Sequence, residues 1–441
     1  MNSIRIHPEA IERRYAPLNA TGAIDGNAAN GFLRPPYSDP ESAAMALLEQ
    51  AASGRGLNCR YDAAGNLIIE SAGNYSEWIE TGSHIDTVPG GGNFDGTAGV
   101  VAGLEALLAI QQSESVLTRG VRLRVWRGEE SATFGVTSIG SRAAFATLEP
   151  QALEKTWQGV TLADAMLSQG VDPVCIKRSQ PAISSAERDS IAAFIELHIE
   201  QGKVLETGNL DIGIVTAIRG SKRSWIRIRG TFDHSGATPM GSEFRQDANL
   251  AMAYMQVELD HLMQRTNSNG ADLVQTVGMI NPHIHDSARL PLNDNAVTKV
   301  SGAACFSFEV RGADAEVVNS YCEKAFALIQ NTAVRFGVTV EIDTFSDQPG
   351  IAELDPDIQA LLADGCDELN LSQMRLPSGA WHDAGTVASQ MRHDGSRIPV
   401  GMIFIPCRAG ISHSRDEYSS PAQIAAGASL LATAMAKLAT M

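Results

Sequence analysis

The residues best suited to chemistry gather behind one short apolar run, which ends at His84. Asp86 and Asp95 follow in a glycine-rich turn, and a helix with apolar residues at helical spacing is predicted after Gly96. A strand, a loop and a helix in this order place polar side chains at the carboxyl end of a sheet, where ligands bind in α/β proteins. Imidazole and carboxylate groups bind metals, and a carboxylate two residues from a histidine can orient its ring. The segment therefore favours a metal site.

Two other interpretations of the segment Trp78–Leu108 are open. A capped helix beside an isolated histidine would give it a purely structural role. A phosphate-binding loop is disfavoured, because the glycines lack the G-x-x-x-x-G-K-[ST] pattern and no lysine is near. A metal site needs further ligands, because one histidine and two aspartates cannot complete it.

Three later predicted strands also lead to ligand-type side chains. The strand 121–126 runs into Glu129 and Glu130, the strand 194–202 carries His198, and the buried strand 402–405 precedes His413. Taken alone, the glutamate pair is better explained as a solvated acidic turn. In a turn at a metal site, one glutamate could bind metal while the other takes a proton from the attacking water.

Five of these side chains are expected to meet at one edge of the sheet, because each lies at the end of a strand or in the loop after it. They are His84, Asp95, Glu130, His198 and His413. Two metal ions about 3.5–4 Å apart that share a bridging carboxylate would use all five. Their convergence is a stronger signal than any of them alone.

The elements that must position these residues predict an α/β fold with a discontinuous catalytic domain, whose mixed, mostly parallel sheet is flanked by helices. Between its two parts the pattern is strand, helix, strand, strand, helix, strand, which is the ferredoxin-like βαββαβ unit. We predict catalytic segments 1–216 and 348–441 and an inserted domain 217–347. We also expect residues 1 to about 40 to be irregular and residues 150–188 to be helical and solvent-facing.

The composition is that of an ordinary globular protein, and its charge disfavours some classes of binding partner. The chain has 441 residues, a net charge of −17 and six scattered cysteines. The negative charge argues against nucleic acid and anionic membranes, and cysteines without C-x-x-C pairs suit reduced thiols. No apolar run approaches the roughly 18 residues of a membrane span, and the first residues lack a secretion signal. We therefore predict a cytoplasmic protein of two domains.

Several motifs together resemble the dinuclear-metal amidohydrolase branch of the M20 peptidase family, which includes N-carbamoyl-L-amino-acid hydrolases, allantoate amidohydrolases and β-ureidopropionases. The matching segments span nearly the whole chain in the same order. They are G-S-H-I-D-T-V-P-G-G-G-N-F-D-G at 82–96, G-E-E at 128–130, E-L-H-I-E-Q-G at 196–202, H-S-G-A-T-P-M at 234–240, R-Q-D-A at 245–248, P-S-G-A-W-H-D-A at 377–384 and S-H at 412–413.

The resemblance implies a role for each matching residue of the centre. His84 and His198 would bind one metal ion, Glu130 and His413 the other, and Asp95 would bridge them. Asp86 would orient His84, and Glu129 would be the general base. The implied cofactors are two divalent metal ions per subunit, zinc first, with manganese, cobalt or nickel as alternatives.

The resemblance also implies how substrate is bound. Arg311 would clamp the substrate carboxylate, and His234 would reach the active site of the other subunit and stabilise the oxyanion. The inserted domain would then serve as a lid and mediate a homodimer. Gln201 and the loop containing Gly379, Trp381 and His382 would line the pocket of a small-molecule N-carbamoyl amino acid or ureide.

Two positions depart from the family's pattern. Thr298 occupies a slot that usually holds asparagine, and its hydroxyl lacks the separate donor and acceptor of an amide. Asn295, three residues earlier, could substitute. Trp381 stands where the family usually has glycine, and an indole there could fill space or stack on a planar part of the substrate. Both departures predict an altered pocket.

The leading hypothesis is hydrolysis of the ureido C–N bond of N-carbamoyl-L-amino acids. Allantoate amidohydrolase is the first alternative and β-ureidopropionase the second. An aminoacylase or dipeptidase fits less well, because the segments at 196–202 and 377–384 belong to the ureido-acting branch. A metal-binding or ligand-sensing relative without catalysis would be expected to have lost Glu129, which is present.

Overall fold

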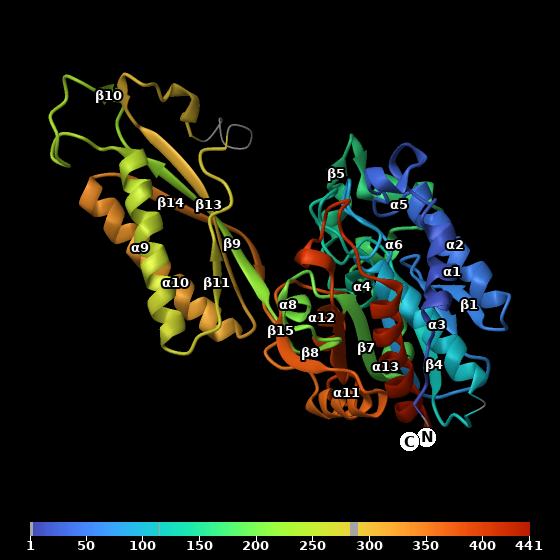
Figure 1. Cartoon of the computed structure of the whole chain (residues 1–441). Coiled ribbons are helices and arrows are strands. Elements are labelled where there is room, and N and C mark those ends of the chain that lie inside the picture. Colours follow the sequence, from blue (N-terminus) through green and yellow to red (C-terminus); the bar gives the residue numbers. More distant parts are fainter. Residues whose placement is uncertain (1–2, 114, 283–289) are drawn as a thin grey trace. The chain divides into compact units, whose positions relative to one another are not determined.

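The computed structural model describes residues 3–113, 115–282 and 290–441. Within them the chain forms two compact units (Figure 1). Unit 1 comprises residues 1–216, 353–378 and 382–441, and unit 2 comprises residues 217–352 and 379–381.

Unit 1 is built on an eight-stranded sheet in the order β1-β2-β4-β3-β7-β16-β8-β15. The central strands β4, β3, β7 and β16 are parallel, whereas β1, β2 and β8 pair antiparallel with their neighbours. The strands are β1 (Asn58–Tyr61), β2 (Leu67–Glu70), β3 (Trp78–His84), β4 (Gly120–Trp126), β7 (Ile191–Ile199), β8 (Ile212–Ile218), β15 (Gln373–Ser378) and β16 (Val400–Ile405). This mixed sheet confirms the predicted α/β class.

Helices cover both faces of this sheet. α3 (Thr97–Gln112) and α13 (Pro421–Thr440) contact β3 and β7 on one face, and α12 (Asp383–Ala388) contacts the same strands on the other. The remaining helices of unit 1 are α1 (Pro8–Leu18), α2 (Asp39–Ser53), α4 (Ile139–Ala144), α5 (Leu162–Ser168), α6 (Val174–Lys177), α7 (Ser185–Asp189), α8 (Val204–Gly208) and α11 (Pro356–Leu369). Short 3-10 turns are η1 (Ile24–Gly26), η2 (Ala28–Asn30), η3 (Pro150–Glu154) and η5 (Arg408–Gly410).

The alternation of side chains along β7 gives its two faces different tasks. Ile195 and Leu197 belong to the apolar core with α3 and α13. Glu196 and His198 are buried on the opposite face, where the backbone N–H of Ala384 in α12 donates to Glu196 Oε2 at 2.7 Å. Successive side chains of a strand point to opposite faces, so this strand packs the core and supplies polar groups to the site.

α13 is long and apolar enough to cross a membrane by composition alone, but 72% of its most apolar window is buried. Leu430, Leu431 and Met435 are fully buried in the core of unit 1. Packing therefore accounts for the composition of this helix. The cytoplasmic location expected from the sequence stays a prediction.

Two local expectations are wrong. Residues 1–40 are not all irregular, because α1 starts with Pro8 at a first-turn position and buries Ile11, Tyr15 and Leu18. Residues 150–188 are not simply solvent-facing. Their short helices and turns bury Leu153, Met166 and neighbouring apolar side chains in a small core that they share with residues 134–148, Tyr37 and Ala64. β5 (Thr156–Trp157) and β6 (Val160–Thr161) form a hairpin within this segment.

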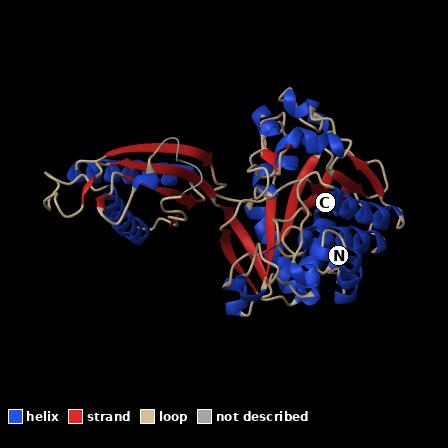
Figure 2. Ribbon diagram, turned by 90° about the horizontal axis from the view of Figure 1, so that it is seen from above, coloured by secondary structure: helices blue, strands red, loops and turns tan. Residues whose placement is uncertain are grey.

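Unit 2 has a four-stranded antiparallel sheet in the order β11-β13-β9-β14, and Figure 2 shows its two long helices alongside the strands. With α9 after β9 and α10 after β13, the chain order is βαββαβ, which is the ferredoxin-like arrangement. Its elements are β9 (Gly220–Arg229), α9 (Ala248–Ser268), β11 (Val274–Thr276), β13 (Ala303–Gly312), α10 (Ala315–Phe336) and β14 (Thr339–Gln348). A small second sheet pairs β10 (Asp233–His234) with β12 (Lys299–Val300), after the turn η4 (Leu292–Asp294).

The main segment of unit 2 runs from residue 217 to residue 352, whereas the sequence predicts the inserted domain at 217–347. The predicted boundary falls within β14, which continues to Gln348. Ile351 then pairs with Ile218, so the exit from unit 2 is bonded to its entry. The loop 379–381 also belongs to unit 2, although both of its flanks belong to unit 1.

A buried ion cluster supports the sheet of unit 1. Glu80 of β3 is fully buried and accepts hydrogen bonds from the Nε atoms of Arg122 and Arg124 on β4. Arg124 also pairs with Glu187 of α7 at 2.9 Å and with Asp62 at 3.3 Å. Burial acts to raise the pKa of Glu80, but the two guanidinium groups hold it below its ordinary value. The cluster therefore joins β3, β4 and α7 through buried ion pairs, in which each charge is stabilised by its partner.

Glu80→Ala should lower the free energy of unfolding by about 3–5 kcal/mol, because it leaves buried guanidinium groups without their main counter-charge. Glu77→Ala is the matched control. Its carboxylate pairs with Arg119 at 2.7 Å but is 51% exposed, and loss of such a surface pair costs less than about 1 kcal/mol. Urea unfolding followed by tryptophan fluorescence measures both variants. Equal losses would contradict the role assigned to Glu80.

Candidate metal centre

The carboxyl ends of the central parallel strands supply the ligand-type residues. β3 ends at His84, and its parallel neighbour β7 carries His198 one residue from its end. β4, the other neighbour of β3, leads into Glu129 and Glu130, and β16 leads through η5 to His413. Parallel strands in register bring their carboxyl ends to one edge, so residues far apart in sequence meet there.

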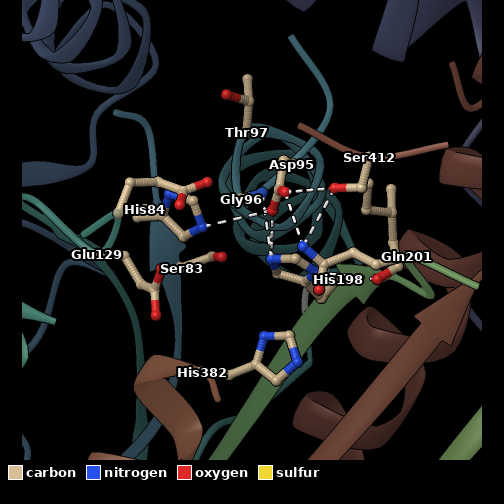
Figure 3. A network of polar contacts seen from close by, with 12 residues as sticks. Ser83, His84, Asp95, Gly96, Thr97, Glu129, His198, Gln201, His382 and Ser412 are labelled. Atoms are coloured by element: carbon tan, nitrogen blue, oxygen red, sulfur yellow. Dashed lines mark hydrogen bonds and ion pairs between the residues drawn. The ribbon is translucent and has the colours of Figure 1, made fainter. Parts of the chain in front are cut away.

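Asp95 lies at the middle of this group (Figure 3). Its Oδ1 is 3.0 Å from His198 Nε2 and 3.7 Å from His84 Nε2. Its Oδ2 is 3.2 Å from His413 Nε2, which is itself 3.3 Å from Glu130 Oε1. The structure thus brings all five predicted ligands together, with a different imidazole set on each oxygen of one carboxylate.

The hydrogen bonds of two imidazole rings fix which nitrogen faces Asp95. His198 Nδ1 lies 2.9 Å from the carbonyl oxygen of Ile199, and His84 Nδ1 lies 3.3 Å from Asp86 Oδ1. When each Nδ1 carries the proton and donates it there, each Nε2 is left with a lone pair directed towards the Asp95 carboxylate. This second hydrogen bond is the usual support of a metal-binding histidine.

Two sets of side chains have the geometry to hold a cation, and both include Asp95. One is His84, Asp95 and His198, and the other is Asp95, Glu130 and His413, with the ligand atoms of each set within 4.8 Å of one another. Imidazole nitrogens and carboxylate oxygens suit zinc, manganese, cobalt and nickel. Lone pairs converging at these separations need a positive charge between them, so the donor set fits two divalent cations.

The same carboxylates and imidazoles shift one another's pKa in the metal-free protein. Burial opposes the change, yet the pKa of Asp95 lies well below its ordinary value because His198, His413 and His84 surround it. Burial acts to lower the pKa of His84, but Asp86 and Asp95 raise it well above its ordinary value. Burial also acts to lower the pKa of His198, but Asp95 raises it. Contacts with Asp95 and Glu130 raise the pKa of His413 to about 11.

Asp86 connects the histidine side of the centre to the glutamate loop. Its Oδ1 accepts a hydrogen bond from the backbone N–H of Glu129, and its Oδ2 accepts one from Glu130, both at 3.0 Å. With its contact to His84 Nδ1, the one carboxylate orients three site residues. The sequence predicted the contact with His84, but not the two with the glutamate backbone.

Glu129 is held from the opposite side by two hydroxyl groups. Ser138 Oγ donates to Glu129 Oε1 at 3.2 Å, and Thr137 Oγ1 approaches the same oxygen at 3.4 Å. Burial raises the pKa of Glu129 well above its ordinary value, and Glu130 adds to the rise. A buried carboxylate with a raised pKa is suited to accept and return a proton.

Gln201 donates a hydrogen bond directly to Asp95, one of the predicted metal ligands, and so does more than line a pocket. Its Nε2 donates to Asp95 Oδ2 at 2.8 Å and lies 3.2 Å from Ser412 Oγ, which also donates to Asp95 at 2.8 Å. Among the described residues, the buried Oε1 of Gln201 has no hydrogen-bond partner. That acceptor is available to a donor of a bound molecule.

His382 lies beneath His198, with ring centroids 4.4 Å apart, and its Nε2 is 2.9 Å from Ser378 Oγ (Figure 3). Burial and the neighbouring His198 hold its pKa well below the ordinary value. Glu196, His198 and His382 are also close enough to form a third ligand group. However, Glu196 already accepts from Ser83 and Ala384, and His198 Nε2 faces Asp95. We therefore regard this group as packing beneath the centre.

In unit 2, His234 is exposed and its tautomer is set by the backbone. Its Nδ1 accepts hydrogen bonds from the N–H groups of Gly236 and Ala237, both at 3.1 Å. The ring proton must then lie on Nε2, which is free to donate. Thr298 is adjacent, because its carbonyl oxygen accepts from the N–H of Ser235 at 3.0 Å.

Asn295, the alternative to Thr298 in the sequence analysis, is held by the backbone of β13. Its Nδ2 donates to the carbonyl oxygen of Ala303 at 2.8 Å, which holds the side chain against β13. Its Oδ1 is buried and has no partner among the described residues. Thr298, by contrast, is exposed beside His234. Of the two candidates for the asparagine slot, Thr298 is therefore the better placed.

Arg311, at the end of β13, is positioned by two acceptors within unit 2. Its Nη1 donates to the carbonyl oxygen of Gly379 at 3.0 Å, and its Nε pairs with Glu309 at 3.1 Å. Trp381 follows two residues after Gly379, and its indole Nε1 is buried with no acceptor among the described residues. The structure thus joins two predicted substrate-binding elements, Arg311 and the loop 379–381.

Sequence reasoning missed residues that hold the loops of the centre in place. Glu417 accepts hydrogen bonds from the backbone of Asp95 and His413. Glu41 accepts from the N–H of Gly128 at 3.1 Å and from Arg127 Nη1 at 2.8 Å, which fixes the turn before Glu129. The partners of both residues are backbone N–H groups and an arginine far away in the sequence, and no pattern in the chain signals either contact.

Gly96 shows why the turn before α3 contains glycine. It has a φ of +63°, and a Cβ there would lie 2.4 Å from His84 Nε2. Any larger residue would displace the imidazole from Asp95 Oδ1. The residue type is therefore dictated by the close approach of the backbone to the ring.

Known protein sequences match this chain over the segments that carry the predicted metal ligands. The profile of peptidase family M20/M25/M40 matches residues 81–437, which include all five ligand-type residues. The chain is 32% identical to a ureidoglycolate hydrolase of Arabidopsis thaliana over 412 residues, covering 91% of this chain and 81% of the relative. It is 31% identical to an N-carbamoyl-L-amino acid amidohydrolase of Geobacillus stearothermophilus over 425 residues, covering 95% and 96%.

Comparison with solved structures extends the likeness to the whole fold. An amidase of the hydantoinase/carbamoylase family from Burkholderia multivorans superposes with a TM-score of 0.83 at 25% identity, covering 99% of each chain.

Metal binding should release protons, because the pKa of His84, His198 and His413 is raised in the metal-free protein and a ligand imidazole must be neutral. Apparent affinity should rise about tenfold per pH unit for each proton released. Calorimetric titration with Zn²⁺ in buffers of different ionisation enthalpy counts the protons. His261→Gln, at an exposed histidine of α9, should leave that number unchanged. An affinity independent of pH between 6 and 8 would contradict this expectation.

Proposed function

The chain belongs to peptidase family M20/M25/M40, and we propose that it hydrolyses the ureido C–N bond of N-carbamoyl-L-α-amino acids. The family and the enzyme class predicted from the sequence are confirmed: this is an amidohydrolase acting on amide or ureido C–N bonds. The products would be the free amino acid, carbon dioxide and ammonia. The observation that carries the proposal is the Asp95 carboxylate between two sets of ligand-type side chains, with Glu129 beside them.

The ligand assignment of this proposal follows the two sets. His84 and His198 would hold one cation, Glu130 and His413 the other, and Asp95 would bridge them. Bound there, two divalent cations would acidify a water molecule and polarise the substrate carbonyl, both of which a poorly electrophilic ureido group requires. Zinc is the first candidate, with manganese, cobalt and nickel as alternatives.

Glu129 would move the proton in both directions. As a carboxylate it takes a proton from the attacking water, and as the acid it returns that proton to the nitrogen that leaves. The hydroxyl groups of Ser138 and Thr137 both contact Oε1, so they favour Oε2 as the oxygen that receives the proton. Asp86 holds the backbone of Glu129 while this happens.

Arg311 would bind the α-carboxylate of the substrate. A guanidinium can form two parallel hydrogen bonds to a carboxylate, which an ammonium cannot. Glu309 and the carbonyl oxygen of Gly379 already orient this guanidinium. The requirement for a free carboxylate is what separates an N-carbamoyl amino acid from a neutral urea.

His234 would stabilise the oxyanion formed during the attack. Its Nδ1 is occupied by two backbone donors, so its Nε2–H is the group that can donate. One donor to an oxyanion is worth about 2.7–4 kcal/mol in comparable enzymes. We propose that this histidine serves the site of the other subunit of a homodimer formed through unit 2.

The surface of unit 2 supports such a dimer. Leu250, Tyr254 and Val257 are 43%, 48% and 55% exposed on α9, and their spacing puts them on one side of the helix. β11 is an edge strand of the four-stranded sheet. An exposed apolar helix stripe beside an edge strand is suited to self-association.

Glu129→Gln should lower kcat by about 10²–10⁴-fold while both cations stay bound, because it removes the proton acceptor but none of the proposed ligands. Glu130→Gln is the contrast, and it should lose one cation equivalent. Ammonia release and elemental analysis measure the two effects. If Glu129→Gln kept more than a tenth of wild-type turnover, Glu129 would not be the base.

The substrate is tested on a panel of N-carbamoyl-L-amino acids with allantoate, β-ureidopropionate and ureidoglycolate. The largest kcat/KM is expected for an N-carbamoyl-L-amino acid. Allantoate as the best substrate would replace the proposal by its first alternative, and turnover that survives complete removal of metal would overturn both.

A mixture of His234→Ala and Glu129→Gln subunits should recover activity that neither variant has alone. In a two-fold dimer each mixed pair holds one site with both groups intact, so about a quarter of wild-type turnover is expected after subunit exchange. Sedimentation verifies that the variants are dimers. No recovery from exchanged dimers would place His234 in its own subunit's site or outside catalysis.

A further inference from the structure

Glu417 is a buried carboxylate that joins two loops of the metal centre. It lies between His413 and α13, and its side chain is directed inwards, with 3% of the residue exposed. Its Oε1 accepts hydrogen bonds from the backbone N–H groups of Phe94 and Asp95, both at 2.9 Å. This oxygen therefore holds the turn that carries the shared aspartate.

The second oxygen of Glu417 holds the loop that carries His413. Oε2 accepts from the backbone N–H of His413 at 3.2 Å and lies 3.4 Å from Ser412 Oγ. Ser412 Oγ in turn donates to Asp95 Oδ2 at 2.8 Å. One carboxylate thus connects loops that are more than 300 positions apart, and three backbone N–H groups donate to it.

The two loops joined by Glu417 carry two of the three members of the second ligand set. Asp95 Oδ2 and His413 Nε2 are 3.2 Å apart, and their separation depends on how the two backbones are placed. His413 has a φ of +56°, a backbone conformation that costs free energy outside glycine and needs surrounding contacts to persist. The hydrogen bond from its N–H to Glu417 is such a contact.

The surroundings leave room for the Glu417 side chain. A Cβ at Gly92 would lie 2.6 Å from both the Cβ and the Oε1 of Glu417. The absence of a side chain at residue 92 therefore lets the carboxylate reach the N–H groups of residues 94 and 95.

We propose that Glu417 is a positioning residue for the second cation, which Asp95, Glu130 and His413 would hold. It does not bind the cation itself, because backbone N–H donors occupy both of its oxygens. It sets the distance between Asp95 and His413 and so determines the affinity of this set. The inference rests on the proposed pair of cation sites.

The test is the binding of Co²⁺ to the metal-free protein, followed by visible absorption and by calorimetry. Wild type should bind two equivalents. Glu417→Gln keeps the shape but replaces one acceptor by a donor, so it should weaken one equivalent ten- to a hundredfold and alter the absorption band of that equivalent. His413→Ala, which removes a proposed ligand of the same set, should affect the same band. Asp416→Asn makes the same charge change one position away, on an exposed side chain, and should bind like wild type.

Gly92→Ala tests the same idea without touching the carboxylate chemically. The added methyl group must displace the Glu417 side chain, so the same equivalent should weaken. Circular dichroism and thermal unfolding establish that both variants are folded. If a folded Glu417→Gln or a folded Gly92→Ala binds two equivalents with wild-type affinity and spectrum, the inference is wrong. If wild type itself binds no cation, the proposed centre fails together with the inference.

Discussion

The shared carboxylate of Asp95 is the constraint from which the rest of the centre follows. Its Oδ1 faces His84 and His198, and its Oδ2 faces His413. A buried carboxylate is costly unless positive or hydrogen-bonding groups surround it, and here three imidazoles meet that need in the metal-free protein. The same three nitrogens are those that a pair of divalent cations would use. The three imidazoles that stabilise Asp95 in the metal-free protein are therefore already close to the positions that metal ligands need. They must lose their protons before they can bind a cation.

Buried carboxylates give this loop-built site its precision. Glu41 holds the backbone of Gly128, Asp86 holds Glu129 and Glu130, and Glu417 holds Asp95 and His413. Each carboxylate accepts hydrogen bonds from backbone N–H groups, so its effect does not depend on which side chain the donating residue carries. Arg34 also holds a loop backbone, but as a donor: its buried guanidinium donates a hydrogen bond to the carbonyl oxygen of Ile85 at 2.8 Å. These contacts join the loops of the centre to one another and fix the positions of the ligand-type side chains, as a site with several ligands requires.

The ligand-type residues could be predicted because they follow strands, and parallel strands deliver their carboxyl ends to one edge. The contacts that support them could not. Glu417 stands in the polar run Ser414–Tyr418, where the pattern is typical of a solvated loop, and its partners at residues 94 and 95 are remote in the sequence. α1 was missed because the glycines, the asparagines and the Pro35-Pro36 pair that follow it suggested an irregular segment. The burial of residues 150–188 in the small core was missed because their helices are too short to show a clear period.

The residues that depart from the family's pattern are confined to one unit. Thr298 and Trp381 belong to unit 2, whereas the five ligand-type residues and Glu129 belong to unit 1. Arg311 and the loop 379–381 also form one body through the hydrogen bond to Gly379. The five ligand-type residues and the two residues that depart from the family's pattern thus lie in separate folding units, each with its own core. Contacts within unit 1 hold its ligand-type residues in place, so a substitution at residue 298 or 381 removes none of the hydrogen bonds that Asp86 and Glu417 make to them.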